Sequence, residues 1–504
     1  MARSREEEVI LGLEGFVPPP ARTYMQQGLR LADWIVSGAF FAVVSLAALL
    51  MGGNRDWAWA PIAVLVGLFA IVIASGAGTR SGFDVWPAER RPLLALCACF
   101  AAFVAFAVFQ MSTLAPLTAS ATYYEAAARL LGKAHAPVPD LAIDAARNSL
   151  VKCLTCGAIF LCARALCRDR GRARLLVYFF LGGAMLVLGY GFLSQATTNS
   201  CYLGSYLKKV GTFEMKDHCV MSGTFVSSNS FGSYCGMALV AALTLLFAPR
   251  RAQGRLPYGY GEREEEGLLA GLTGFRLLML AVSLLMLGGL LISASRAGLA
   301  ATGATVGLVV LLMMRGLWRS RPDLTRLVVI GAIVVGIVVT VIAGRMMVMK
   351  LEHGGSIGER MQIWMASWKA ITLSPWLGWG IGNFADIYTI LQPASMTQPN
   401  DLAHSTPLEV MVEVGIPMAF VVYAILLIPW GATLYGALAI RFAHRYLPVS
   451  ALAVATVPTL HSTIDFSLQM PAIGFVVSAM LGMGWAQAFG RRELVEMPLR
   501  GHDR

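Results

Sequence analysis

The sequence predicts an all-α, polytopic integral membrane protein, and three observations favour this fold class: composition, repeated apolar segments and the placement of arginines. Of the 504 residues, 57% are hydrophobic and 14% are charged, and the mean hydropathy is +0.65. Average proteins carry about 25% charged residues. Apolar segments of roughly 20 residues, long enough to cross about 30 Å of hydrocarbon as helices, recur along the chain. A soluble fold is therefore excluded.

About 12 segments are expected to span the membrane. The first follows a charged stretch and is long enough to be retained as an anchor rather than cleaved as a signal peptide. The later ones are separated by charged, polar or Gly/Pro-containing stretches. The predicted spans are 32–52, 57–78, 92–111, 148–166, 173–195, 230–248, 274–293, 297–314, 326–344, 415–437, 447–464 and 471–489.

Arginine-rich stretches fall in alternate connections between these spans. They lie at 164–174, 249–264, 315–326 and 491–492. Cytoplasmic connections of membrane proteins carry an excess of Lys and Arg. We therefore attribute the net charge of +11 to membrane topology rather than to nucleic-acid binding, and we expect both termini to be cytoplasmic.

Two long connections, 196–229 and 345–408, are then extracytoplasmic. Cys201 and Cys219 share the first of them, where disulfides persist, and we expect them to be bridged. The other seven cysteines lie in spans or at a cytoplasmic helix end and are expected to act as small buried hydrophobic residues. This includes the Cys153-Cys156 pair, whose redox-like spacing lies inside an apolar helix.

The second long connection begins with a predicted amphipathic helix. Met361, Trp364 and Trp368 recur at helical spacing, which is typical of a helix lying at the membrane interface. Arg360 lies in its first turn, where a guanidinium and a helix N-terminus together favour an anion. The glycines that follow at 378, 380 and 382 lack the strand of a dinucleotide-binding loop, and we expect them to allow close backbone approach.

Four ionisable residues reach the same membrane face in this topology: Arg296, Arg360, His404 and Asp465. Two guanidiniums suit a pyrophosphate, because each offers paired N–H donors to phosphate oxygens. A histidine with a reference pKa of about 6.5 can accept a proton from a hydroxyl at neutral pH. Arg296 could instead reach toward lipid headgroups, and His404 or Asp465 could simply cap a helix end.

Two glutamates, Glu409 and Glu413, lie one helical turn apart just after His404. We expect them to line the adjacent wall of the site or to fix the loop, with Glu413 assigned to substrate binding. Gly415 and Pro417 are expected to break this short helix before the next span.

The ordered motifs of this chain resemble those of bacterial O-antigen ligases and the related O-antigen or exopolysaccharide polymerases. In order, the motifs are "GGNRDWAW" (52–59), "GTFVSSNSFGSY" (223–234), "SASRAG" (293–298), "GERMQIWMASWKAITLSPWLGWGIGNF" (358–384), "AHSTPLEVMVEVGIP" (403–417) and "HSTIDFSLQMPA" (461–472). The family often has His-Asn where this chain has His404-Ser405, and Asn-x-Asn-His where it has Ser227 to Ser230. Both differences concern contacts to the acceptor.

The resemblance implies a metal-independent, multi-pass glycosyltransferase of the bacterial inner membrane, without a cofactor, that acts at the periplasmic face. The donor would be a glycan linked to undecaprenyl diphosphate, and the acceptor would be the lipid A core, another lipid-linked glycan or a protein hydroxyl. It also implies that Arg296 and Arg360 hold the donor diphosphate and that His404 activates the acceptor.

The sequence is divided into a cytoplasmic N-terminal segment, two transmembrane regions, a catalytic region with the large loop, and a C-terminal tail. Their predicted boundaries are 1–31, 32–195, 196–344, 345–475 and 476–504. The alternative function is a transporter or flippase of lipid-linked glycans. Transporters usually place ionisable or helix-breaking residues near the bilayer midplane in two related halves. Here these residues gather at one face, which favours the enzyme.

Overall fold

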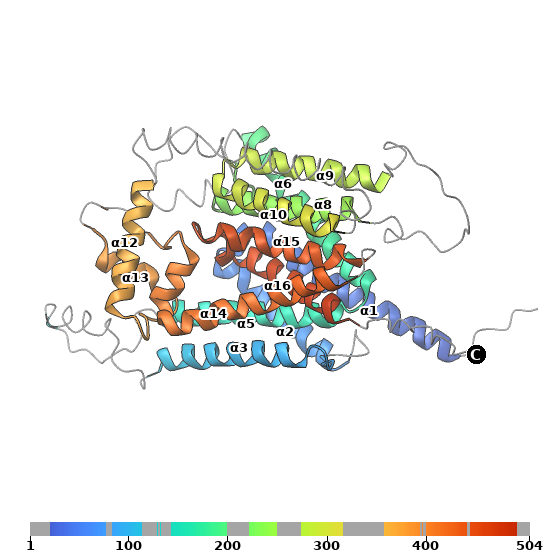
Figure 1. The fold of residues 1–504 in the computed structure, drawn as a ribbon, viewed down its shortest axis with the longest axis horizontal. Coiled ribbons are helices and arrows are strands. Elements are labelled where there is room, and N and C mark those ends of the chain that lie inside the picture. The colour runs from blue at the N-terminus through green and yellow to red at the C-terminus, as the bar shows by residue number, and fades with distance from the viewer. Residues whose placement is uncertain are drawn as a thin grey trace, which may run out of the picture.

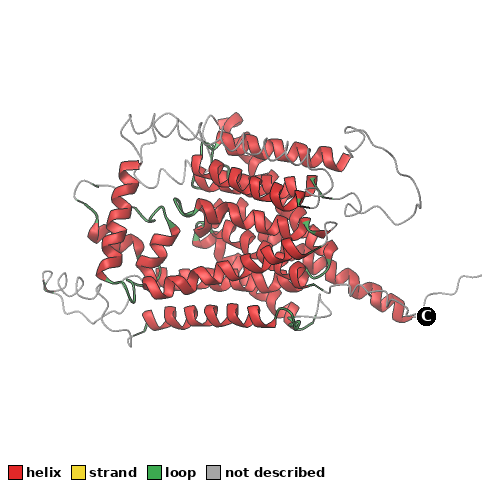
Figure 2. Cartoon of the chain, in the orientation of Figure 1, coloured by secondary structure: helices red, strands yellow, loops and turns green. Residues whose placement is uncertain are grey.

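The computed structural model describes residues 21–76, 83–112, 129, 132, 143–198, 221–248, 274–315, 357–393, 396, 400–440 and 444–490. Within these ranges the chain is built from helices and short loops and contains no strand (Figures 1 and 2). The predicted all-α fold is confirmed. Cys201 and Cys219 lie outside the described residues, so their bridge stays a prediction.

The described elements are long helices, shorter helices and short 3₁₀ turns. The α-helices are α1 (Ala21–Leu46), α2 (Asp56–Ala74), α3 (Arg90–Gln110), α5 (Ile143–Leu166), α6 (Arg170–Thr198), α8 (Ser228–Leu246), α9 (Gly274–Ile292), α10 (Arg296–Met314), α12 (Ile357–Leu373), α13 (Phe384–Leu391), α14 (Thr406–Ala439), α15 (Tyr446–His461) and α16 (Pro471–Phe489). The 3₁₀ turns are η2 (Ala47–Leu49), η3 (Met51–Gly53) and η6 (Ser467–Gln469).

The predicted spans agree with these helices. Ten described helices are long and apolar enough to cross a membrane, and α15 is a shorter apolar helix. The remaining predicted span, 326–344, lies outside the described residues. The protein is therefore a multi-pass membrane protein.

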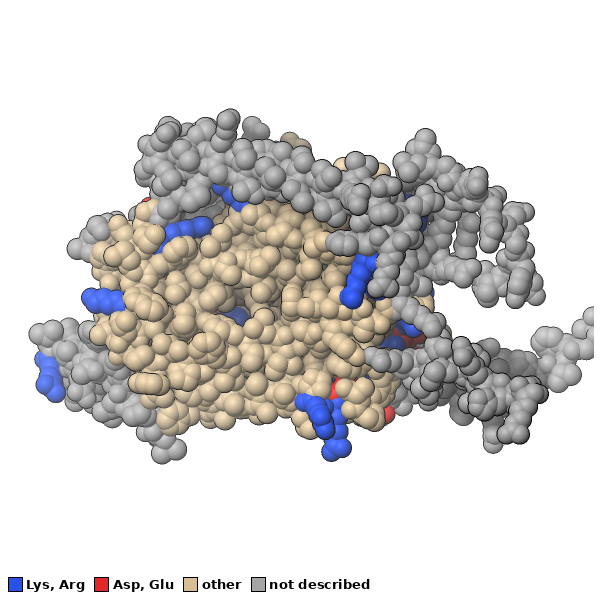
Figure 3. All heavy atoms as spheres, in the orientation of Figure 1, with Lys and Arg blue, Asp and Glu red and all other residues tan. Residues whose placement is uncertain are grey.

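The long helices run side by side, and α12 crosses their ends (Figure 1). α15 and α16 pack against each other and are almost completely buried, so they form the centre of the bundle. Outer helices expose large apolar side chains, for example Leu278 and Leu284 on α9. One broad face is almost free of charge, with its few basic side chains toward the ends and edges (Figure 3). This is the surface expected of a bundle solvated by lipid.

Helix α14 has a break at Gly415, where φ is 73°, as the sequence predicts. Pro417 follows and has no N–H, so the carbonyl oxygen of Glu413 loses its helical donor. The backbone N–H of Gly380 and the amide of Gln110 donate to this oxygen instead, at 2.9 Å and 3.0 Å. The carbonyl oxygen of Glu413 is therefore satisfied despite the break.

The glycine-containing loop before α13 fits against this break. A Cβ on Gly378 would lie 2.3 Å from the Glu413 carbonyl oxygen, and one on Gly382 would lie 2.8 Å from the Ala145 carbonyl oxygen. Side chains larger than hydrogen would separate the loop from α14 and α5. The prediction that these glycines allow close backbone approach is confirmed for Gly378 and Gly382, and the loop fixes the position of the segment that leads to the site.

The end of the bundle opposite α12 contains a buried ion pair that the sequence did not reveal. Glu89 accepts hydrogen bonds from Arg164 Nε at 2.9 Å and from Trp485 Nε1 at 2.7 Å, and a second Arg164 nitrogen contacts its other oxygen. Burial acts to raise the pKa of Glu89, but hydrogen bonds from Arg164 and the Trp86 N–H, with the arginine charge, lower it below its usual value. Both side chains are almost completely buried.

Replacing Arg164 with methionine is expected to lower the free energy of unfolding by about 3–5 kcal/mol, because it removes the cation that is hydrogen-bonded to a buried carboxylate and leaves only the more distant Arg168, at 3.7 Å. Thermal unfolding of the purified protein in detergent measures the effect. Arg91→Met is the matched control, since Arg91 is exposed and lies two residues after Glu89, at the same end of the bundle. Equal unfolding temperatures for the two variants would show that the pair does not stabilise the bundle.

Candidate active site

A buried carboxylate, Asp465, lies at the centre of the candidate active site. It follows α15 and precedes η6, and its side chain is 0% exposed. The Asn229 side chain donates to Oδ2 at 2.6 Å, and the Phe466 N–H donates to Oδ1 at 2.7 Å. These contacts fix both carboxylate oxygens in one orientation.

Three basic side chains surround this carboxylate. Arg360 Nη2 lies 3.5 Å from Oδ2, His404 Nδ1 lies 3.9 Å from Oδ1, and His461 Nε2 lies 3.9 Å from Oδ2. His461 is buried, and its Nδ1 lies 3.0 Å from the Ser467 hydroxyl. The structure therefore brings together three of the predicted site residues, Arg360, His404 and Asp465, from segments more than 40 residues apart.

The backbone at His404 has a rare conformation. Its φ is 51°, in the left-handed region, which costs a non-glycine residue about 1–3 kcal/mol and persists only where the surroundings impose it. The preceding residue, Ala403, donates its N–H to Glu409 Oε2 at 2.8 Å and accepts from Trp364 Nε1 at 3.1 Å. On the other side, the Thr406 N–H donates to the Ser462 carbonyl at 2.9 Å. The prediction that a glutamate fixes this loop is confirmed for Glu409.

His404 is suited to accept a proton at neutral pH. Burial lowers its pKa below the usual histidine value, and the Arg360 charge adds to this, while Asp465 and Glu359 act in the opposite direction. Its ring packs edge-on against Phe466, with 5.1 Å between ring centroids. Since Nδ1 is the nitrogen beside Asp465, the carboxylate favours the tautomer protonated there, and Nε2 is then the basic nitrogen.

Arg296 is the first residue of α10 and is half-buried. The residue before it, Ser295, packs against α8: a Cβ on Gly232 would lie 2.8 Å from the Ser295 Cβ. Gly232 is one turn from Asn229, which contacts Asp465. Arg296 therefore begins beside the helix that contacts the site, but the described residues show no ion pair between it and Asp465, and its role stays a prediction.

Glu413 lies on α14, nine residues after His404. Its carbonyl oxygen closes the α14 break, and the residue lines a large cavity between α5 and α14. Its assignment to substrate binding stays a prediction. In the part of the chain that the structure describes, no group of three or more His, Cys, Asp or Glu residues is arranged to hold a metal ion.

Two features of the site were not predicted. The sequence does not predict the contact of Asn229 with Asp465, although the place of Asn229, two residues after the N-cap Ser227, fixes it at the half-buried start of α8. Trp364 was grouped with the interfacial tryptophans, yet it turns inward to Ala403 while Trp368 is 58% exposed. Helical spacing alone did not separate the two, because they lie four residues apart on one helix face.

The comparisons with known proteins address the identity of this region. The comparison with curated proteins finds no significant match. A family model described as O-antigen ligase matches residues 281–424, the segment that contains Arg296, Arg360 and His404. The resemblance indicated by the motifs is therefore confirmed over this segment, which is the part of the chain that is similar to O-antigen ligases.

Proposed function

We propose that the protein is a glycosyltransferase that moves a saccharide from undecaprenyl diphosphate to a hydroxyl acceptor at the periplasmic face of the inner membrane, as an O-antigen ligase or a polysaccharide polymerase does. The observation that carries this proposal is the convergence of Arg360 and His404 on the buried Asp465, with both residues inside the segment that matches the O-antigen ligase family.

The residues divide into two roles. Arg360 reaches Asp465 and the Ile464 carbonyl only at 3.5 Å and 3.4 Å, so most of its N–H donors remain able to bind diphosphate oxygens. Arg296 would supply a second guanidinium from the start of α10. These charges would stabilise the diphosphate as it departs, an effect commonly worth several kcal/mol.

His404 would act as the general base. The acceptor oxygen bonds to the anomeric carbon, the bond from that carbon to the diphosphate oxygen breaks, and the hydroxyl proton passes to His404 Nε2. Asp465 would be a positioning residue that orients the imidazole and stabilises its protonated form. The activated donor carries its own leaving group, so this scheme requires no nucleotide.

The fold supports a periplasmic site. α3 begins with Arg90 and Arg91 beside the buried Glu89–Arg164 pair, and it ends at Gln110, whose side chain donates to the Leu377 carbonyl close to the site. Its 21 residues would span about 30 Å as a helix. The arginine-rich end and the site therefore lie at opposite ends of a membrane-spanning helix, which favours a cytoplasmic location for the former.

The direct test uses the purified protein in detergent, with an undecaprenyl-diphosphate-linked saccharide and a lipid A core acceptor. We expect the glycosylated acceptor and free undecaprenyl diphosphate to form in equal amounts. A second reaction with lipid-linked donor alone distinguishes polymerase activity, which would lengthen the lipid-linked glycan. If neither acceptor is glycosylated by inserted, folded protein, but lipid-linked glycan crosses vesicle membranes, the protein is a transporter instead.

A further inference from the structure

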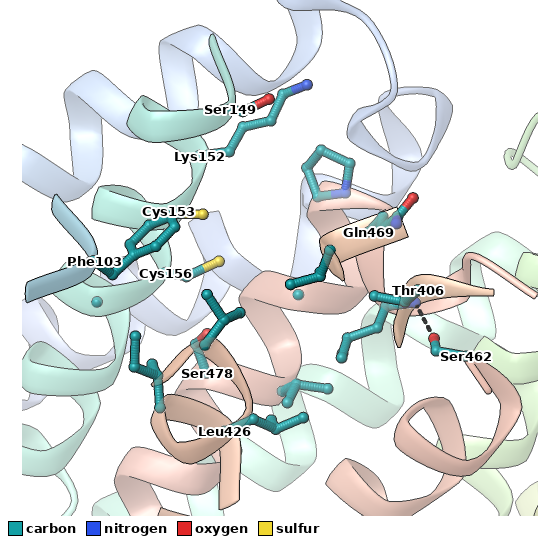
Figure 4. A pocket seen from close by; sticks show the side chains of 18 of the residues that line it. Phe103, Ser149, Lys152, Cys153, Cys156, Thr406, Leu426, Ser462, Gln469 and Ser478 are labelled. Atoms are coloured by element: carbon teal, nitrogen blue, oxygen red, sulfur yellow. Dashed lines mark hydrogen bonds between the residues drawn. The ribbon is translucent and has the colours of Figure 1, made fainter. Parts of the chain in front are cut away.

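A large cavity lies beside the site, between α3, α5, α14 and α16 (Figure 4). Its volume is approximately 1330 Å³, above the roughly 300–1,000 Å³ of pockets for drug-sized ligands. Most of its wall is apolar: Leu93, Phe103 and Leu161 contribute from α3 and α5, and Leu426 and Leu481 from α14 and α16. Because these helices are candidate membrane spans, such a space suits hydrocarbon chains.

One end of the cavity is polar. Asn148, Ser149 and Lys152 line it from α5, and Asn54 lines it from the turn before α2. In Figure 4, Ser149 and Lys152 lie together at one end, while Leu426 and Ser478 lie deeper. The polar end is on the side of the bundle where α5 begins, which is also the side of the candidate active site. A headgroup bound there would reach the site, and its chains would extend into the bundle.

Lys152 provides a positive charge at this end. It lies within the candidate span Ile143–Leu166, where an ionisable side chain is costly and usually serves a ligand or a partner. Its ammonium lies 5.2 Å from the centre of the Trp59 ring, and Asp56 is the nearby acid. The two Asp56 oxygens accept from Trp59 Nε1 at 2.9 Å and from Asn148 Nδ2 at 3.3 Å. Among the described residues no hydrogen bond reaches the ammonium, so it remains available to an anion.

The cavity also touches the candidate active site, but not from the side of the arginines. Thr406 and Glu409 line it from the start of α14, and Phe466, which packs against His404, lines it from the loop after α15. No described residue of α10 or α12, the helices that carry Arg296 and Arg360, contributes to its wall. The His404 segment is therefore flanked by two different regions, one with the arginines and one with the cavity.

We propose that this cavity binds the lipid-anchored acceptor. Its hydrocarbon chains occupy the apolar part, a phosphate of its headgroup pairs with Lys152, and its hydroxyl reaches His404 from the flank opposite the donor diphosphate. The inference rests on the proposed function, because it assigns the second substrate of that transfer to a separate site. An acceptor with several chains fits the volume, and a cation surrounded by apolar walls selects a phosphorylated lipid over a neutral one.

The experiment compares four variants in direct binding to two lipids, diphosphorylated lipid A and undecaprenyl diphosphate, in detergent. Lys152→Met removes the charge, Lys152→Arg keeps it, Leu426→Trp fills the apolar part, and Lys369→Met removes an exposed lysine of α12 as the control. We expect Lys152→Met to weaken lipid A binding about tenfold, because one charge-assisted contact is lost. Leu426→Trp should weaken lipid A binding by about the same factor, because the indole occupies space that the hydrocarbon chains need. Neither variant should change undecaprenyl diphosphate binding. Lys152→Arg and Lys369→Met should bind both lipids as the natural sequence does.

A transfer assay separates failure of this inference from failure of the proposed function. The expected result is a higher KM for the acceptor in Lys152→Met, with an unchanged KM for the donor. If Lys152→Met and Leu426→Trp weaken undecaprenyl diphosphate binding instead, the cavity holds the donor chain, and the acceptor assignment is wrong. If transfer is normal and both variants bind lipid A normally, the inference fails while the glycosyltransferase stands. If the natural sequence neither binds the donor nor transfers a saccharide, the proposed function fails and the inference fails with it.

Discussion

Replacing His404 with alanine is expected to slow saccharide transfer by about 10²–10⁴-fold, the usual contribution of a general base, and to leave donor affinity nearly unchanged. The structure gives the reasons. His404 lies 3.9 Å from the buried Asp465 and is held in a strained backbone conformation that a simple helix cap would not need. The residue before it, Ala403, is hydrogen-bonded to Trp364 and Glu409, and these bonds hold the His404 segment in place. The position of the ring therefore does not depend on the arginines proposed to bind the donor.

Single-turnover transfer with pre-bound donor measures the chemical step, and direct binding of the lipid-linked donor measures affinity. His444→Ala is the matched control, because His444 lies beside Arg170 at the opposite end of the bundle. Near-normal transfer by folded His404→Ala protein would remove this histidine from the mechanism and leave it as a structural residue.

The pH dependence of the same rate provides an independent test. Burial lowers the pKa of His404, so the neutral, basic form persists below the ordinary histidine pKa of about 6.5. The rate of the natural sequence should therefore stay constant from neutral pH to below that value and then fall as the imidazole is protonated. In His404→Ala, the transfer rate should no longer fall at acidic pH. If the rate of the variant still falls there, another group is responsible for this pH dependence.

The sequence predicted those features of the protein that depend on residues close together in the chain. Apolar segment length located the helices, and Gly415 followed by Pro417 located the break in α14. Arg360, His404 and Asp465 could be selected because charged residues at the ends of apolar segments are few. Motif order then indicated the family.

The sequence did not predict contacts between residues far apart in the chain. The pairing of Asn229 with Asp465 joins positions 236 residues apart, and the Glu89–Trp485 hydrogen bond joins positions 396 residues apart. Neither pair has a local pattern, because each depends on which helices pack together. Only the packing of α5 against α2 and α16 places Lys152 at the cavity. The cysteines were expected to be buried, yet Cys97 is exposed on α3, where lipid takes the place of a protein core.

Replacing Arg360 with alanine is expected to weaken binding of the lipid-linked donor by about 2–5 kcal/mol, the range for removing one partner of a partly buried charge pair. The guanidinium is 29% exposed and lies in the first turn of α12, so it can contact Asp465 and an incoming diphosphate together. Arg360→Lys should retain part of the affinity, because an ammonium keeps the charge but not the paired donors.

The same donor-binding measurement on Arg147→Ala is the control for Arg360→Ala. Arg147 is an exposed arginine of α5 near the same end of the bundle, and its ion pair with Asp144 is 3.4 Å long and solvent-exposed, so its loss should not change donor affinity. Arg360→Ala also removes a cation from beside a buried carboxylate, so a thermal unfolding curve must accompany the affinity. If Arg360→Ala lowers the unfolding temperature but binds the donor with normal affinity, Arg360 is a structural partner of Asp465. Another cation would then bind the diphosphate. Lowered affinity in a folded variant would place the leaving group beside α12, within reach of an acceptor hydroxyl at His404.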